Sequence, residues 1–377
     1  MYNNLEHLST EDIEELVRRY YNGEAVAQLI EEYHLSVRTS SLYKLFPREV
    51  LTNVVCEYCG TNLVRDRPPR NSVKYIFMDQ YAYCPSCNHM PNMLGCRCIN
   101  CIEKEQSEQV FRAQQINEFY SVGIPPVDFD SLSFESKVFC GALFRTLGKE
   151  NLVEIKPYIE AHTPLAPTKE LIDEIYHHLC STGVIAVSPT SPVDAFVVDE
   201  TFPRTYHTYR VGYHLNLTFP DNKQSLINTI LNPTFYLPEE NDDALKLWRK
   251  IAVAECVEYL MYQLKKVRFV FTPGEKTYEV FEVLLNDFSV SQIYGIIWKA
   301  VAGASKLYLE KGFNKKHAAN SVITGCERIG DRARLYGWNL AEYHRIKELP
   351  QSSLSAYFFN RVLGIGDLGF TTPPQII

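Results

Sequence analysis

The sequence predicts an α+β protein that is mostly α-helical and is organised as several segments in series. Apolar residues recur at the i, i+3, i+4 and i+7 spacing of a helix near the N-terminus and through most of the C-terminal third. Seven cysteines fall between residues 56 and 101, among Gly, Pro and Asn. Only short stretches alternate as a β-strand does. These three observations predict helical segments on either side of a small cysteine-rich module.

The composition is that of a globular protein. The 377 residues are 46% hydrophobic and 22% charged, with a formal net charge of −7. No apolar run reaches the roughly 18 residues that cross a bilayer, and the acidic start MYNNLEHLSTEDIEEL differs from a signal peptide. We therefore expect a cytoplasmic protein with no membrane partner. Residues 120–244 are acidic (8 Lys/Arg against 17 Asp/Glu) and suit a protein partner, whereas residues 245–350 are basic (17 against 11).

Residues 1–50 predict three short helices. The first is capped by Ser9 or Thr10 and ends at Asn22-Gly23, and the third stops at Pro47. A tight turn before the third helix is the helix-turn-helix plan, and this segment resembles the helix-turn-helix heads of bacterial recombinases and transposon-linked regulators. The alternative is a small bundle for protein contact. The third helix would present candidate nucleic-acid contacts: Arg38, Lys44 and Arg48.

Residues 51–105 predict a zinc ribbon. Two CxxC pairs, Cys56-Glu-Tyr-Cys59 and Cys84-Pro-Ser-Cys87, are each followed by Gly or Asn. A CxxC turn directs two thiolates at one tetrahedral ion, and the residue after it tolerates the positive φ that closes the turn. Two such turns supply four ligands for Zn²⁺. The four cysteines outside this segment are expected to be buried thiols rather than disulfides.

A second cluster follows directly, in NHMPNMLGCRCINC. Together with the CxxC pairs it brings the number of ligands to eight, enough for two four-coordinate ions. The spacing leaves open whether the two sites are sequential or interleaved, and whether one or two of these residues are spare. With four protein ligands each, the sites would be structural and would leave no position for catalytic water. The candidate ligands of this cluster are His89, Cys96, Cys98 and Cys101.

Four cations lie between the CxxC pairs, on the expected hairpin loop of the ribbon. They predict either a finger that contacts phosphates or a solvated loop stiffened by Pro68 and Pro69. These candidate nucleic-acid contacts are Arg65, Arg67, Arg70 and Lys74.

Residues 106–133 are expected to be a linker, and residues 134–240 a winged-helix-like α+β segment. Helices are predicted over 134–147 and before Ser181-Thr-Gly183, and strands over 184–187 and 207–217. Because the intervening stretch is acidic, this segment suits a protein partner at least as well as DNA.

Residues 241–377 predict a basic α-helical domain. Helices are expected over 243–266, 275–287, 290–311, 315–336 and 351–363, with a strand over 267–271. Cations interleaved with aromatic residues suit phosphate contact and base stacking, and the alternative is a solvated bundle surface. The candidate contacts are Lys315, Lys316, Arg328, Arg332 and Arg334.

Signals for an enzyme are weak. The letters GxGxxG occur from Gly364 to Gly369, but they follow a helix and fit no βαβ unit, so dinucleotide binding is rejected. No other catalytic motif with convincing spacing is present. We therefore lean towards a protein without catalytic activity and assign no catalytic residue.

The helix-turn-helix head, the ribbon ending in CxCxxC and the KKHAANS motif of the α-rich tail together resemble a family of bacterial proteins associated with mobile elements or phage defence. The leading hypothesis is a zinc-stabilised protein that binds nucleic acid, most simply DNA, as a regulator or the recognition subunit of such a system. One alternative is an interaction or immunity protein without nucleic-acid binding. Another is a nuclease-like enzyme with an unrecognised site.

Overall fold

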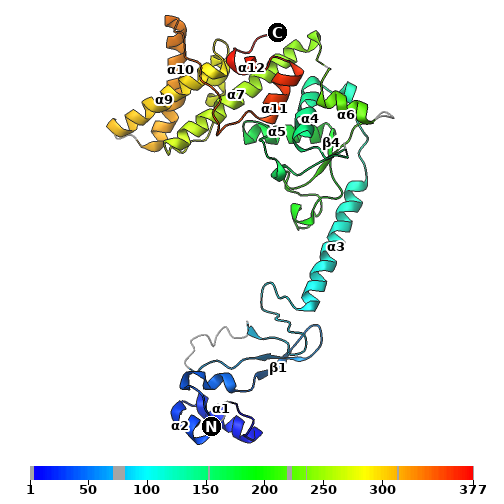
Figure 1. Ribbon diagram of the computed structural model, residues 1–377, viewed down its shortest axis with the longest axis vertical. Coiled ribbons are helices and arrows are strands. Elements are labelled where there is room, and N and C mark those ends of the chain that lie inside the picture. Colours follow the sequence, from blue (N-terminus) through cyan, green and yellow to red (C-terminus); the bar gives the residue numbers. More distant parts are fainter. Residues whose placement is uncertain are drawn as a thin grey trace. The chain divides into compact units, whose positions relative to one another are not determined.

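The computed structural model describes residues 4–70, 81–151, 153–218, 223–234, 236–311 and 314–376. The chain forms two compact units, Met1–Arg112 and Ala113–Ile377 (Figure 1). Helices make up 54% of the residues, and the few short strands form two small sheets. The predicted class, α+β and mostly α, is confirmed. No helix in the described part of the chain is both long and apolar enough to cross a membrane.

The first unit opens with a small helical head. Helices α1 (Thr10–Tyr21) and α2 (Val26–Glu32) are followed by the 3₁₀-helix η1 (Thr39–Leu45). Ser9 caps α1, and the Asp12 side chain accepts the Ser9 N–H in return, so a full capping box forms. The third element, expected as a short helix, is a 3₁₀-helix of seven residues.

The cysteine-rich part of the first unit is built on a two-stranded antiparallel sheet. Strand β1 (Glu49–Val55) pairs with β2 (Asn62–Arg65), and the register shifts between Leu51 and Val55. Helix α3 (Ile99–Ser121) begins at the end of this module and runs into the second unit.

Helix α3 occupies much of the stretch over 106–133 that is expected to be a linker, and the boundary between the two units falls within it. The segment is rich in Glu, Gln, Lys and Arg, which favour helix intrinsically. It lacks an apolar stripe, and Ile116 is its one buried residue. The periodicity criterion therefore misses it.

After the end of α3, the second unit continues with the segment predicted to resemble a winged helix. It contains α4 (Phe134–Leu147), β3 (Glu154–Ile155), α5 (Lys169–Ser181), β4 (Ile185–Val187) and β5 (Tyr213–Leu215). Strand β5 pairs antiparallel with both β3 and β4, which gives the sheet order β3-β5-β4. The strand predicted over 207–217 is confined to three residues, because His207 O accepts the N–H groups of Arg210 and Val211 in a turn.

The rest of the second unit is helical. Helix α7 (Asn241–Lys266) is followed by α8 (Glu275–Leu284), α9 (Val290–Lys311) and α10 (Lys315–Tyr336), close to the predicted spans. No strand forms over 267–271, where the prediction is wrong: no neighbouring strand is there to pair with it, and Arg268 has a φ of 57°. The remaining helices are η3 (Phe129–Ser131), η4 (Tyr158–Glu160), η5 (Val193–Ala195), α6 (Lys223–Leu231), η6 (Pro238–Glu240), α11 (Ser353–Tyr357), the π-helix η7 (Phe358–Val362) and α12 (Leu368–Thr371).

One hydrophobic core joins the two parts of the second unit that the sequence separates at residue 240. Phe139 of α4, Ile251 of α7, Ile297 of α9 and Phe358 of η7 belong to the same buried cluster. Helix α4 approaches α11 closely at Gly141, where a Cβ atom would meet the Tyr357 ring. The acidic and the basic segment therefore fold around a shared interior.

Candidate metal centres and charged surfaces

The first cysteine cluster is formed by the two CxxC turns. Each turn closes through a residue with positive φ, Gly60 at 67° and Asn88 at 57°, as the sequence predicts. The N–H groups of Gly60 and Asn88 donate to the carbonyls of Cys56 and Cys84 at 2.9 and 2.8 Å. These local turns direct all four thiols to one point: Cys56, Cys59, Cys84 and Cys87.

The distances within this cluster suit a tetrahedral ion. The Sγ–Sγ separations are 3.6 Å for Cys56–Cys87, 3.2 Å for Cys59–Cys84 and 3.9 Å for Cys59–Cys87. Four thiolates at about 2.3 Å from Zn²⁺ would lie about 3.8 Å apart. Hydrogen bonds from the side chain and backbone of Thr61 lower the pKa of Cys59 to about 6, which favours the thiolate that binds metal.

The second cluster gathers three thiols around one nitrogen of His89. The Nδ1 atom lies 3.7 Å from Cys96 Sγ, 3.6 Å from Cys98 Sγ and 3.3 Å from Cys101 Sγ. A tetrahedral ion with one imidazole and three thiolates would place nitrogen and sulfur about 3.6 Å apart. His89 is buried and Cys101 lies in the first turn of α3, so the helix start forms part of the cluster.

The two clusters are sequential rather than interleaved. Ligand atoms lie within 4.8 Å of one another inside each set of four. Each set could hold one metal ion, and each supplies all four positions of a tetrahedral site. Neither leaves a position for a catalytic water.

The first CxxC turn also contacts the second cluster through its two middle residues. Glu57 Oε1 lies 3.2 Å from His89 Nε2, close enough for an ion pair but without the alignment of a hydrogen bond. Tyr58 OH lies 3.7 Å from Cys101 Sγ, and its ring meets the His89 ring edge-on at 4.8 Å. A carboxylate beside the free nitrogen orients a ligating histidine. Sequence reasoning missed both residues, although their position between two ligands was a usable signal.

The cations expected on the ribbon loop are engaged within the first unit. Arg65 Nε lies 2.9 Å from Glu49 Oε2, and Arg67 Nε donates to Pro47 O at 2.9 Å. Arg70 Nη1 donates to the carbonyls of Tyr20 and Glu24. The Arg65 contact joins β2 to β1, whereas those of Arg67 and Arg70 hold the loop against the helical head. Lys74 lies outside the described residues.

The candidate nucleic-acid contacts on the helical head differ in whether they are already engaged in an ion pair. Arg48 pairs with Asp66 at 3.3 Å and lies over the Tyr83 ring. Arg38 and Lys44 are exposed and have no ion-pair partner within the described ranges. They are the head's open cations.

Most of the candidate nucleic-acid contacts on α10 are also exposed and without an ion-pair partner among the described residues. Lys315, Lys316, Arg328 and Arg332 are exposed, and no acidic side chain pairs with them in the described part of the chain. Arg334 differs, because it pairs with Asp287 at 2.6 Å and with Asp331 at 3.0 Å.

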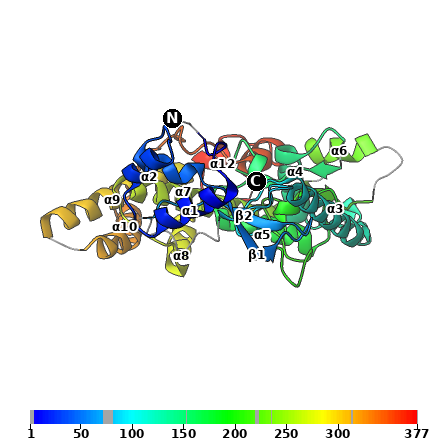
Figure 2. The ribbon, with the colours of Figure 1, turned by 90° about the horizontal axis from the view of Figure 1, so that it is seen from below.

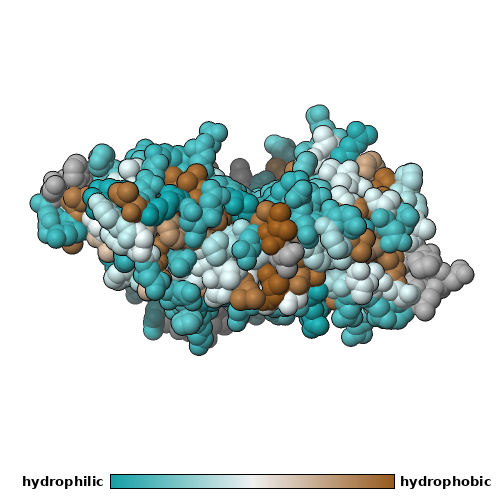
Figure 3. Space-filling view, turned by 90° about the horizontal axis from the view of Figure 1, so that it is seen from above, coloured by the Kyte–Doolittle hydropathy of each residue, from teal (hydrophilic) through white to brown (hydrophobic). Residues whose placement is uncertain are grey.

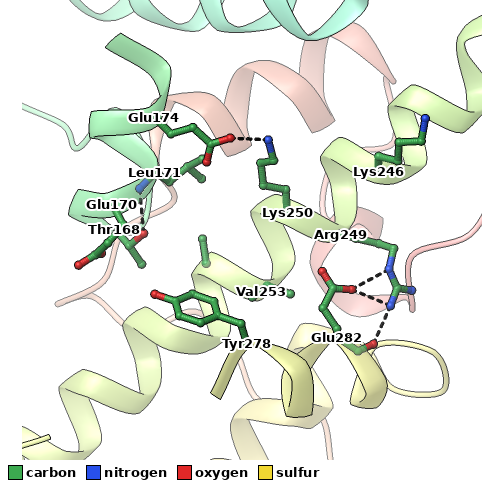
Figure 4. A pocket seen from close by; sticks show the side chains of 11 residues that line it. Thr168, Glu170, Leu171, Glu174, Lys246, Arg249, Lys250, Val253, Tyr278 and Glu282 are labelled. Carbon is green, nitrogen blue, oxygen red and sulfur yellow. Dashed lines mark hydrogen bonds and ion pairs between the residues drawn. The ribbon is translucent and has the colours of Figure 1, made fainter. Parts of the chain in front are cut away.

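A hollow of about 500 Å³ lies between α5, α7 and α8, and its charges are balanced (Figure 4). Lys250 Nζ lies 2.6 Å from both Glu135 and Glu174, and Arg249 pairs with Glu282 at 2.8 Å. Figure 4 shows Glu174 pointing toward Lys250 and Glu282 pointing toward Arg249. A phosphate would have to displace a carboxylate, so this hollow does not suit an anion.

The helix that would read DNA in a winged helix is α5, and its exposed face is acidic. Glu170, Asp173 and Glu174 are exposed, and Glu174 is tied to α7 through Lys250. Carboxylates repel phosphates, so this face does not suit a nucleic-acid backbone.

Comparison with models of protein families, with curated proteins and with solved structures finds no match.

Proposed function

We propose that the two clusters hold two structural Zn²⁺ ions in a protein that binds nucleic acid. The observation that carries the zinc assignment is the pair of closed four-ligand sets, with seven thiols and one imidazole between them. Thiolate and imidazole ligands in tetrahedral sets favour zinc over magnesium, calcium or manganese. The metals stabilise the first unit and take no part in chemistry.

Nucleic-acid binding is supported by the distribution of open cations. Arg65, Arg67 and Arg70 serve internal contacts. The exposed cations of α10, and Arg38 and Lys44 on the head, keep their charge available to phosphates. A role as a regulator or recognition subunit of a mobile-element or phage-defence system follows from the resemblance described above.

Elemental analysis of the purified full chain tests the zinc assignment. We expect two Zn per chain, and one in the Cys96→Ser variant because only the second centre loses a ligand. Cys180→Ser is the matched control: Cys180 lies outside both clusters, and this variant should keep two. Less than one Zn per chain in the unsubstituted protein would overturn the assignment.

Titration with labelled oligonucleotides tests nucleic-acid binding. Between about 50 and 200 mM salt, binding through several phosphate contacts should weaken by orders of magnitude. Absence of binding to both duplex and single strand at about 50 mM salt would refute the proposal.

A further inference from the structure

A hollow of about 780 Å³ lies between α9 and α10, which pack against each other and lie side by side in Figure 2. The two helices meet at small residues, where a Cβ on Gly325 would lie 3.2 Å from Ala300 Cβ. Lys299, Lys306 and Arg328 line it, together with hydroxyl and amide side chains from α10. Its one carboxylate, Glu310, lies 3.8 Å from Lys306 Nζ. Hydroxyl, amide and cationic groups are the donors that bind phosphate oxygens.

Two further hollows continue from this one. Asn320 lines both the first hollow and a second of about 520 Å³, which also carries Lys315 and Lys316. Val270 and Phe271 line both the second hollow and a third of about 800 Å³. We call the three together the α9–α10 trough, and its cations are Lys265, Arg268, Lys299, Lys306, Lys315, Lys316 and Arg328.

The trough has a net positive charge, which is carried by its first two hollows, while cations and carboxylates balance in the third. Its seven Lys and Arg side chains face three carboxylates, those of Glu258, Glu310 and Glu348. This excess of positive charge distinguishes the trough from the hollow of Figure 4, in which cations and carboxylates balance. On the face seen in Figure 3, hydrophilic residues predominate at the left end of the molecule, where α9 and α10 lie. A charged trough of this kind suits an extended polyanion.

One end of the trough adds an exposed apolar side chain and a partly buried aromatic one to the charge. Val270 is 86% exposed, and Phe271 beside it is partly exposed. The Tyr262 ring is covered by Lys266, whose Nζ lies 4.6 Å from the ring centroid. Phe271 is therefore the aromatic side chain that can receive a base. Cations with an aromatic platform are the means by which proteins bind unpaired strands.

Duplex DNA is disfavoured by the same structure. A major groove is read by an inserted helix or β-ribbon. The third element of the head is a seven-residue 3₁₀-helix, and the exposed face of α5 is acidic. A duplex also keeps its bases stacked inside, so Phe271 would have no base to contact.

We propose that the α9–α10 trough binds single-stranded nucleic acid, with phosphates on its cations and a base stacked on Phe271. This inference rests on the nucleic-acid function proposed above and adds to it the class of strand and the surface that binds it.

Fluorescence anisotropy on the full chain tests the inference, with labelled single-stranded DNA, single-stranded RNA and blunt duplex of one length. The Lys315→Gln/Lys316→Gln variant should bind single strands about tenfold more weakly, with a shallower salt dependence. Phe271→Leu keeps an apolar side chain but removes the aromatic face, and should also weaken binding about tenfold. The matched control is Lys156→Gln/Arg361→Gln, which removes two exposed cations of the second unit that line none of the three hollows.

The outcomes separate the inference from the function on which it rests. If the unsubstituted protein binds no strand of any kind, the nucleic-acid function fails and the trough with it. If only the control variant loses binding, the function stands and the trough assignment is wrong. Duplex binding as tight as single-strand binding would overturn the assignment of strand class. Circular dichroism melting of each variant must match the unsubstituted protein for these comparisons to count.

Discussion

Removal of both metals should unfold the cysteine-rich part of the first unit and leave the second unit folded. The perturbation is a strong chelator with a thiol reductant, applied to the full chain. The two units have separate interiors: the second has one extensive hydrophobic cluster, whereas the cluster around the CxxC turns contains only Cys56, Leu63, Ala82 and Cys84 as buried members among the described residues.

The magnitude follows from that small cluster. Leu63 is its largest buried side chain that is not a ligand, and its burial contributes about 2–3 kcal/mol. Ordering the backbone of the seven residues of β1 costs about 1–2 kcal/mol each. A structural zinc site contributes about 10–16 kcal/mol of apparent binding free energy at neutral pH. The metals are therefore the dominant stabilising contribution in this module.

Hydrogen exchange measured by mass spectrometry is the assay. On metal removal, peptides covering Glu49–Val55 should lose their amide protection, because the first CxxC turn is the connection that brings β1 and β2 together. Peptides from Asn241–Lys266 should keep theirs, since α7 lies in the core of the second unit. Unchanged protection of β1, in protein shown by elemental analysis to be metal-free, would refute this reasoning.

Three further substitutions have defined outcomes. Burial, aided by the charge of Glu255, raises the pKa of Glu258 from 4.5 to about 7. Between these two pH values the folded protein keeps a proton on Glu258 that the unfolded chain has released. The free energy of unfolding therefore falls as pH rises from about 4.5 to 7. Glu258→Gln should remove that fall, on the order of 2 kcal/mol, in urea unfolding across pH. Gly141→Ala places a methyl group against Tyr357 and should cost about 1–3 kcal/mol in thermal unfolding. Glu57→Gln should lower the affinity of the second centre for zinc about tenfold, as measured by competition with a chelator.

For each of these three predictions, one experimental result would contradict it. A Glu258→Gln protein that keeps the pH dependence would show that another group titrates. Gly303→Ala is the matched control for Gly141→Ala, because nothing lies within 4 Å of its added methyl group, and it should be neutral or stabilising. Equal destabilisation by both would argue against overpacking. Equal loss of zinc affinity at both centres in Glu57→Gln would show that Glu57 does not act through His89.

Local features of the structure were predictable because neighbouring residues decide them. The CxxC turns and their positive-φ residues depend on a few adjacent positions, and the spans of α9 and α10 follow from apolar periodicity. Helix α3 was missed for the converse reason, since an exposed helix has no apolar stripe. The strand expected over 267–271 did not form because a strand needs a partner that periodicity cannot supply.

The sequence by itself determined the inventory: eight potential metal ligands, a mostly helical chain, and a basic segment after an acidic one. Tertiary structure decided which of these ligands share a site and which of these charges are paired. It divided the eight ligands into two sequential sets and placed Glu57 of one turn beside His89 of the other set. It also paired Arg65 with Glu49 while leaving Lys315 and Lys316 open. The physical reason is that ligand type and helix propensity are local, whereas the pairing of a charge depends on groups brought close only by folding.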